Sequence, residues 1–125
     1  MSYWQTLQSS HRPLFLPDIG TYFNQDMAQA KQLVDGLLQA GVKVIKGEIL
    51  QNADVCLDAE ISGNERYWGL RSDDFLEENY RALIERKVVS LAAYKDLMDY
   101  ASSRGAKWIM SVYDFEGEKK KKKMG

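Results

Sequence analysis

Polar side chains stand at the carboxyl ends of three short apolar segments of this chain. Alternate residues of a strand share one face, and three such series begin apolar and turn polar: Leu14, Leu16 and Asp18; Val42, Val44, Lys46 and Glu48; Ile109, Ser111 and Tyr113. Ligands of parallel α/β folds bind at the carboxyl ends of strands. The pattern is therefore typical of the inner face of a barrel, where apolar side chains pack together at the start of the strands and a solvated polar site lies at their carboxyl ends. The alternative is that strands simply become polar as they leave the core.

The elements that must position these residues alternate between strands and helices. Asn24 or Asp26 can cap the first helix and Ser90 the last, while Gly41 and Gly105 end them. The alternation predicts βα units, a parallel sheet and right-handed crossovers, which is an α/β fold. The predicted strands are 13–18, 42–46 and 107–112, the predicted helices are 26–40, 73 or 74 to 86, and 91–103, and residues 47–72 form a long functional loop that could hold a short helix.

Composition favours one compact soluble domain. Of the 125 residues, 45% are apolar and 28% are charged, which is enough apolar material for a core. No apolar run approaches the ~20 residues that span a bilayer, and the start does not look like a secretory signal. We therefore expect a cytoplasmic protein with no membrane partner. Cys56 is the only cysteine, so it cannot form an internal disulfide, and a bystander thiol is a simpler interpretation than a nucleophile.

The charge distribution argues against a nucleic-acid partner. The formal net charge is −1, but without the five lysines at 119–123 there remain 12 basic and 18 acidic residues, a charge of −6. The body of the chain is acidic, and it shows no basic face with interleaved aromatic residues. A flexible lysine block provides only sequence-independent attraction.

Three stretches of the chain carry motifs of a known family. Phe15-Leu-Pro-Asp-Ile-Gly20, followed by Asn24-Gln-Asp26, resembles a strand ending in Glu-Ile-Gly and its Asn-His-Asn-Gly-Asp loop. Gly41-Val-Lys-Val-Ile-Lys46 resembles a second strand with Ala-Val-Lys-Phe-Gln, and Met110-Ser-Val-Tyr-Asp114 resembles a strand end with Ser-Thr-Pro-Phe-Asp. Over roughly residues 13–117, the chain thus resembles the N-terminal part of the sialic acid (N-acetylneuraminate) synthase family.

This resemblance implies a partial TIM (β/α) barrel, with the first three strands and their helices, and a substrate site. The family joins phosphoenolpyruvate to an N-acetylated amino sugar such as N-acetylmannosamine, releasing phosphate and forming a nine-carbon 2-keto acid. A divalent metal, Mn²⁺ or Mg²⁺, activates the sugar aldehyde. By this resemblance, Lys46 matches the lysine that holds phosphoenolpyruvate, and Ser111 matches the hydroxyl residue that hydrogen-bonds the same ligand. Asp18 matches the glutamate that contacts the acceptor sugar. Asp18 and Lys46 are thus the expected catalytic residues, and Asn24 and Glu48 complete the expected substrate-binding set.

Each of these residues also has a simpler interpretation. Lys46 could be a solvated lysine at a strand end, and Asp18 and Ser111 could be turn or capping groups. Asn24 suits a helix cap better than a ligand contact, and Asp114 suits a loop or a cap.

Three departures from the family pattern affect the expected site. Asp18 is one methylene shorter than glutamate, and Phe23-Asn24-Gln25 replaces a His-Asn-Gly pattern. Glu48 replaces a glutamine two residues from Lys46, so both side chains should point to one face. A carboxylate there repels a multiply charged anion and partly neutralises the lysine.

The chain also lacks much of what the family uses. A barrel of this kind takes about 250 residues and eight strands, and the only histidine, His11, precedes the first strand and matches none of the family's metal ligands. We therefore expect no complete metal site, no family reaction by this chain alone, and self-association or a partner at the open sheet edges. The expected organisation is an N-terminal extension over 1–12, a partial barrel over 13–117 and a disordered Lys-rich tail over 118–125. We further hypothesise that a frameshift at the adenine-rich lysine run truncated a longer gene.

An alternative assignment is a small non-enzymatic α/β module, flavodoxin-like in outline, that binds an anionic ligand or a protein partner. Its helices would pack on both faces of the sheet. The residues that would then face helices are Leu14, Leu16, Val42, Val44 and Ile109.

Overall fold

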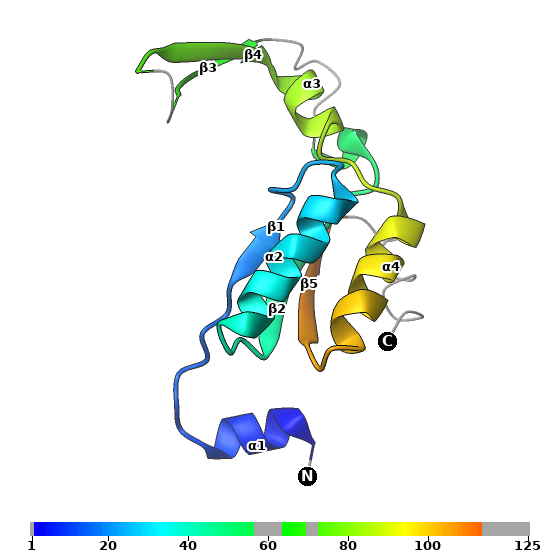
Figure 1. The fold of residues 1–125 in the computed structure, drawn as a ribbon. Coiled ribbons are helices and arrows are strands. Elements are labelled where there is room, and N and C mark those ends of the chain that lie inside the picture. The colour runs from blue at the N-terminus through cyan, green and yellow to red at the C-terminus, as the bar shows by residue number, and fades with distance from the viewer. Residues whose placement is uncertain (1, 57–63, 70–72, 114–125) are drawn as a thin grey trace.

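Three parallel strands form the centre of the computed structural model, which describes residues 2–56, 64–69 and 73–113. The strands are β1 (Asp18–Gly20), β2 (Val44–Ile49) and β5 (Lys107–Val112), and the sheet order is β1-β2-β5. All of them run in the same direction (Figure 1). The predicted α/β fold with parallel strands alternating with helices is confirmed.

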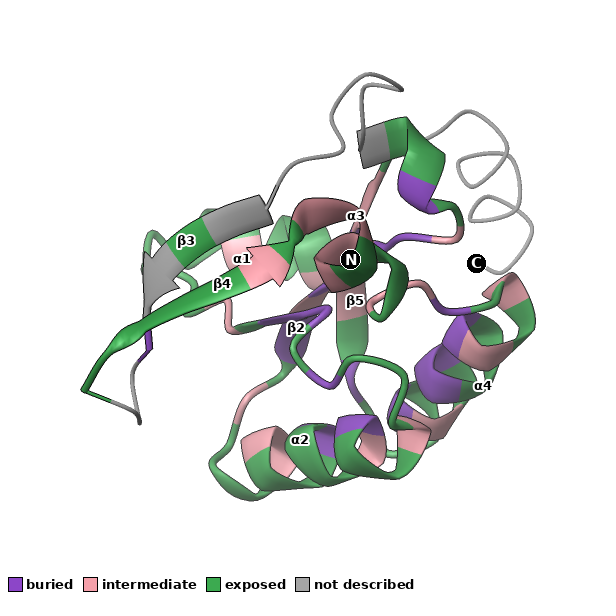
Figure 2. Ribbon diagram, turned by 90° about the horizontal axis from the view of Figure 1, so that it is seen from above, coloured by how far each residue is buried: buried purple, intermediate pink, exposed green. Residues whose placement is uncertain are grey.

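Two helices, α2 (Met27–Gln39) and α4 (Leu91–Ser102), cover one face of this sheet. Their buried positions face the sheet and their exposed positions face outward (Figure 2). The buried apolar residues pack into one core between helices and sheet; they are Ile19, Phe23, Ala30, Val34, Ile45, Ile49, Val89, Tyr94, Leu97, Met98, Ala101, Ala106 and Met110. No helix of the described part of the chain covers the opposite face, where Ile109 is exposed. The alternative prediction of helices on both faces, with Ile109 against one of them, is therefore wrong for these residues.

Local signals fix where the helices begin and end. The Asp26 side chain caps α2 by accepting from the Gln29 backbone N–H at 3.0 Å, and Ser90 caps α4. After α2, Gly41 takes φ +87, a conformation that favours glycine. Of the two predicted caps for α2, Asp26 is the one used.

The strand boundaries differ from the predicted ones for a backbone reason. Pro13 and Pro17 have no N–H to donate, so the predicted strand 13–18 begins only at Asp18. The Pro17 carbonyl still accepts from the Lys46 N–H at 2.8 Å. The strand predicted over 42–46 lies at Val44–Ile49, whereas β5 has the predicted bounds.

The helix predicted from Asp73 or Asp74 to 86 is wrong in its first half. Strand β4 (Phe75–Asn79) pairs antiparallel with β3 (Asn64–Trp68), and this hairpin projects away from the sheet (Figure 1). Only α3 (Tyr80–Glu85) is helical, capped by the Asn79 side chain. The acidic residues of β4 have cross-strand and local partners: Arg66 faces Glu77 in register, and Arg86 forms two hydrogen bonds with Glu78, at 2.9 and 2.8 Å.

The remaining described segments are short. A 3-10 turn, η1 (Ala53–Cys56), follows β2 inside the predicted loop. In the predicted N-terminal extension, α1 (Tyr3–Ser9) forms behind a capping box of Ser2 and Gln5, at the end of the molecule where the strands begin (Figure 1). Asp114 and the predicted tail lie outside the described residues. Among the helices that the structure describes, none is long and apolar enough to cross a membrane.

Candidate functional site

The sheet face opposite the helices carries four of the residues predicted for the site. Ile45 and Ile49 of β2 and Met110 of β5 point into the core, so the residues that alternate with them point the other way. Asp18 is opposite Lys46 in register, and Glu48 is opposite Ser111. Asp18, Lys46, Glu48 and Ser111 therefore lie together on neighbouring parallel strands.

Lys46 is held between two carboxylates. Its ammonium group donates a hydrogen bond to Asp18 Oδ2 and lies 3.8 Å from Glu48 Oε1. The hydrogen bond to Asp18 raises the pKa of Lys46, and attraction to Asp18 and Glu48 raises it further, against the opposing effect of burial. The lysine is therefore a firmly protonated cation, suited to binding an anion and unsuited to acting as a base or an amine nucleophile.

Asp18 is engaged on both carboxylate oxygens. Oδ1 accepts from the Gly20 backbone N–H at 2.7 Å, and Oδ2 accepts from Lys46. Gly20 itself takes φ +43, and a β-carbon there would lie 3.3 Å from the Tyr22 ring. The turn after β1 thus holds the carboxylate beside the lysine, and Asp18 is a turn group as well as a site candidate.

Gly47 separates the two charged residues of β2 and points to the covered face. A β-carbon at this position would come 3.0 Å from Met110 Sδ and 3.2 Å from its Cε. The absence of a side chain lets Met110 pack against β2. Gly47 therefore leaves room on the covered face for the Met110 side chain, while Lys46 and Glu48 face the site.

Asn24 lies apart from these contacts. It occupies the turn before α2 with φ +52, and its Oδ1 accepts from Lys87 Nζ at 3.3 Å. The neighbouring Gln25 side chain donates to the carbonyls of Glu85 and Val88, at 3.2 and 3.0 Å. This turn is thus anchored to the end of α3, a link that sequence reasoning missed because its two sides lie about 60 residues apart.

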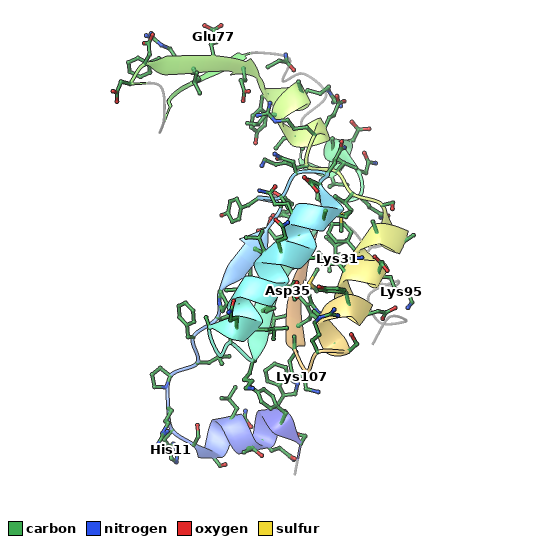
Figure 3. The ribbon with its side chains drawn as sticks, in the orientation of Figure 1. His11, Lys31, Asp35, Glu77, Lys95 and Lys107 are labelled. Carbon is green, nitrogen blue, oxygen red and sulfur yellow. The ribbon has the colours of Figure 1, made fainter. Side chains whose placement is uncertain are left out.

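The described residues do not fit the divalent metal that the family resemblance implies. None of their His, Cys, Asp and Glu side chains form a group of three or more that could hold a metal ion. The two carboxylates of the site flank an ammonium group, which repels a cation. His11 lies beside α1, at the end of the molecule opposite the hairpin (Figure 3).

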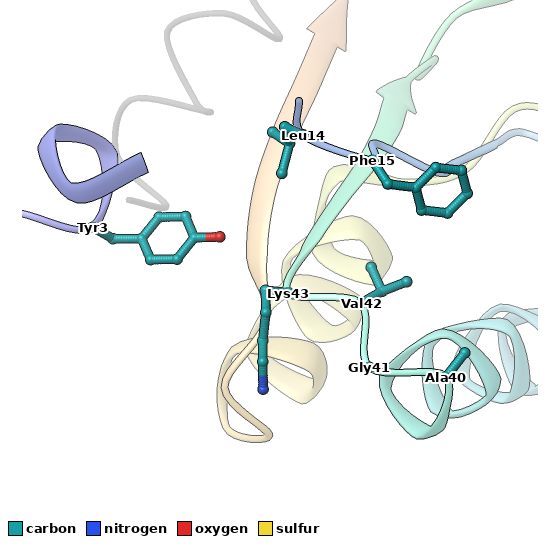
Figure 4. Close-up of a pocket in the computed structure, with 7 residues that line it drawn as sticks. All are labelled: Tyr3, Leu14, Phe15, Ala40, Gly41, Val42 and Lys43. Atoms are coloured by element: carbon teal, nitrogen blue, oxygen red, sulfur yellow. The ribbon is translucent and has the colours of Figure 1, made fainter. Parts of the chain in front are cut away.

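A separate hollow of about 340 Å³ lies on the amino-terminal side of the strands. Its lining is apolar except for the Tyr3 hydroxyl and Lys43, whose ammonium end points away from Leu14 and Phe15 (Figure 4). The hollow contains none of the four site residues. We therefore place the candidate site at Lys46 and its neighbours rather than here.

Comparison with known proteins identifies the fold. A solved structure of N-acetylneuraminic acid (sialic acid) synthetase from Leptospira borgpetersenii serovar Hardjo-bovis, in complex with citrate, matches with a TM-score of 0.68 at 13% sequence identity. The match covers 91% of this chain and 34% of that chain, so this chain spans about a third of that protein's length. No protein-family model and no curated protein matches the sequence. The chain thus has the fold of part of a sialic acid synthase TIM barrel.

Proposed function

We propose that this chain is the N-terminal, substrate-binding segment of a sialic acid synthase-like enzyme. Such an enzyme condenses phosphoenolpyruvate with an N-acetylated amino sugar to a nine-carbon 2-keto acid. The observation that carries the proposal is the placement of Asp18, Lys46 and Ser111 on three neighbouring parallel strands, on the face without helices. In a closed barrel that face is the interior, and substrates bind at its carboxyl-terminal end.

The proposed roles follow from the chemistry of each group. The Lys46 ammonium binds the carboxylate or phosphate of phosphoenolpyruvate, and the Ser111 hydroxyl donates a hydrogen bond to the same ligand. Asp18 accepts hydrogen bonds from hydroxyls of the acceptor sugar. The new carbon–carbon bond joins carbon 3 of phosphoenolpyruvate to the aldehyde carbon of the sugar, whose oxygen takes up a proton; water adds to carbon 2, and inorganic phosphate leaves as the 2-keto group forms.

We further propose that these residues bind but do not complete the reaction alone. The described residues form three parallel strands, whereas a closed barrel has eight. The metal that polarises the aldehyde would be held outside the described residues. The organisation into an N-terminal segment over 1–12, a partial barrel over 13–117 and a tail over 118–125 belongs to the same proposal.

Ligand-dependent thermal stability tests this proposal. We expect phosphoenolpyruvate, with or without Mn²⁺, to raise the melting temperature of the wild-type chain, because a ligand that binds only the folded state stabilises it. The Lys46→Ala variant should lose this rise. Lys31→Ala is the matched control: Lys31 of α2 pairs with Asp96 of α4, on the side of the sheet away from the site, so its loss should leave the rise unchanged. A wild-type chain whose melting temperature is unchanged at millimolar phosphoenolpyruvate would contradict the proposal.

A further inference from the structure

Glu48 lies next to both groups that would hold an anionic ligand. It follows Lys46 by two residues on the same face of β2, and it stands directly opposite Ser111 on β5. Facing residues on neighbouring strands are about 5 Å apart, and alternate residues of one strand are about 7 Å apart. Lys46 instead faces Ile109 in register. A ligand that touches both the Lys46 ammonium and the Ser111 hydroxyl therefore lies diagonally across this face, directly beside the Glu48 carboxylate.

The charges of this row oppose a multiply charged anion. Asp18, Lys46 and Glu48 together carry a formal charge of −1, and the ammonium lies within 4.0 Å of both carboxylates. The side chains of Lys46 and Glu48 are only 27% and 26% exposed, so solvent screens their interactions less than on an open surface. The two carboxylates thus partly neutralise the positive charge of Lys46, and Glu48 adds repulsion beside the position where the anion would lie.

We propose that Glu48 is a specificity-determining residue that weakens, without abolishing, the binding of multiply charged anions at this site and leaves its affinity for neutral sugars unchanged. The inference rests on the proposed function, because it concerns the same site and the same ligand. A glutamine at position 48 has nearly the same shape and can still donate and accept hydrogen bonds, but it carries no charge. The Glu48→Gln variant therefore isolates the effect of the charge from the effect of the side-chain volume.

Titration calorimetry of the full chain with two probes tests the inference. Phosphoenolpyruvate carries several negative charges and N-acetylmannosamine carries none. We expect Glu48→Gln to bind phosphoenolpyruvate about tenfold more tightly than the wild type, since one charge acting a few ångströms from the anion changes the binding free energy by about one to a few kcal/mol. Binding of N-acetylmannosamine should change by less than about twofold, because no net charge is involved. The gain for phosphoenolpyruvate should shrink at high salt.

The matched control is Glu77→Gln, which removes one carboxylate from the hairpin, far from the site (Figure 3). It should leave both affinities unchanged. If Glu48→Gln binds phosphoenolpyruvate no more tightly than the wild type, or tightens both probes alike, the inference is wrong while the proposed function stands. If neither protein binds phosphoenolpyruvate, the proposed function fails, and the inference fails with it.

Discussion

At the scale of single residues, a buried tyrosine supports the strand that carries the site. Tyr94 of α4 is 1% exposed, and its hydroxyl accepts a hydrogen bond from the Leu50 backbone N–H at 3.1 Å. Leu50 follows directly after β2 and is itself buried. The tyrosine thus links a covering helix to the end of the strand that holds Lys46 and Glu48.

We predict that Tyr94→Phe lowers the free energy of unfolding by about 1–3 kcal/mol, because the buried Leu50 N–H loses its acceptor. Urea denaturation followed by circular dichroism measures this change. Tyr100→Phe is the control: that hydroxyl donates to Asp35 near the surface, where water can replace it, so a smaller loss is expected. Equal losses of unfolding free energy in both variants would show that the buried Tyr94 hydrogen bond stabilises the fold no more than the exposed Tyr100 hydrogen bond does.

The buried hydroxyl of Tyr94 also predicts that the chain loses stability at high pH. Burial raises the pKa of Tyr94 above its ordinary value of 10.0. The folded state therefore holds this proton when the unfolded state has already released it, and the free energy of unfolding falls as the pH rises above 10.0. Lys46 and Tyr100 act in the same direction because their pKa values are also raised. We expect a shallower fall in Tyr94→Phe than in the wild type when denaturation is repeated between pH 9 and about 11.

At the scale of elements, α2 depends on a cap that lies in the turn after β1. Asp26 accepts from the Gln29 N–H, while Asn24 two residues earlier turns the chain with a positive φ. The cap therefore sets where the helix begins relative to the strand, and α2 supplies Ala30 and Val34 to the core.

We predict that Asp26→Ala destabilises the chain by about 1 kcal/mol, whereas Asp26→Asn keeps most of the stability, because asparagine also caps helices well. Chemical denaturation of the two variants measures the difference. If the alanine and asparagine variants are equally stable, the side-chain cap does not stabilise α2.

At the scale of the whole molecule, the described helices cover only one face of the sheet. Ile109, in the middle of β5, is 36% exposed on the other face, and in the described part of the chain no strand lies beside the outer edge of β1. In the complete barrel that this fold resembles, such a face lies inside. The edge of β1 that no described strand pairs with, and the exposed apolar side chain of Ile109 on this face, favour association with another surface.

We predict that the chain self-associates as its concentration rises, and that Ile109→Ser weakens this association without unfolding the chain. Sedimentation velocity at several concentrations measures the association. Ile45→Ser is the contrasting variant, since Ile45 is fully buried on the covered face and its loss should unfold the protein. A wild-type chain that stays monomeric at high concentration would argue against an exposed barrel face.

The sequence by itself determined the elements whose signals are local. The spacing of apolar residues and the caps at Asp26 and Ser90 predicted α2 and α4, and the apolar run 107–112 predicted β5, because periodicity, capping and glycine stops act within a few residues. The alternation on each strand also predicted which residues share a face within that strand, whereas the placement of Asp18, Lys46 and Ser111 on one face of the sheet depends on strand register and was decided by the tertiary structure.

Tertiary structure decided what depends on contacts between distant residues. The hairpin of β3 and β4 replaced a predicted helix because Phe75–Asn79 pairs with Asn64–Trp68, a choice that local propensity cannot make. The Asn24–Lys87 contact and the ion pair between Asp18 and Lys46 join residues 63 and 28 positions apart. Only the packing of the helices revealed which face of the sheet is covered, because an isolated strand pattern is the same whichever side faces the core.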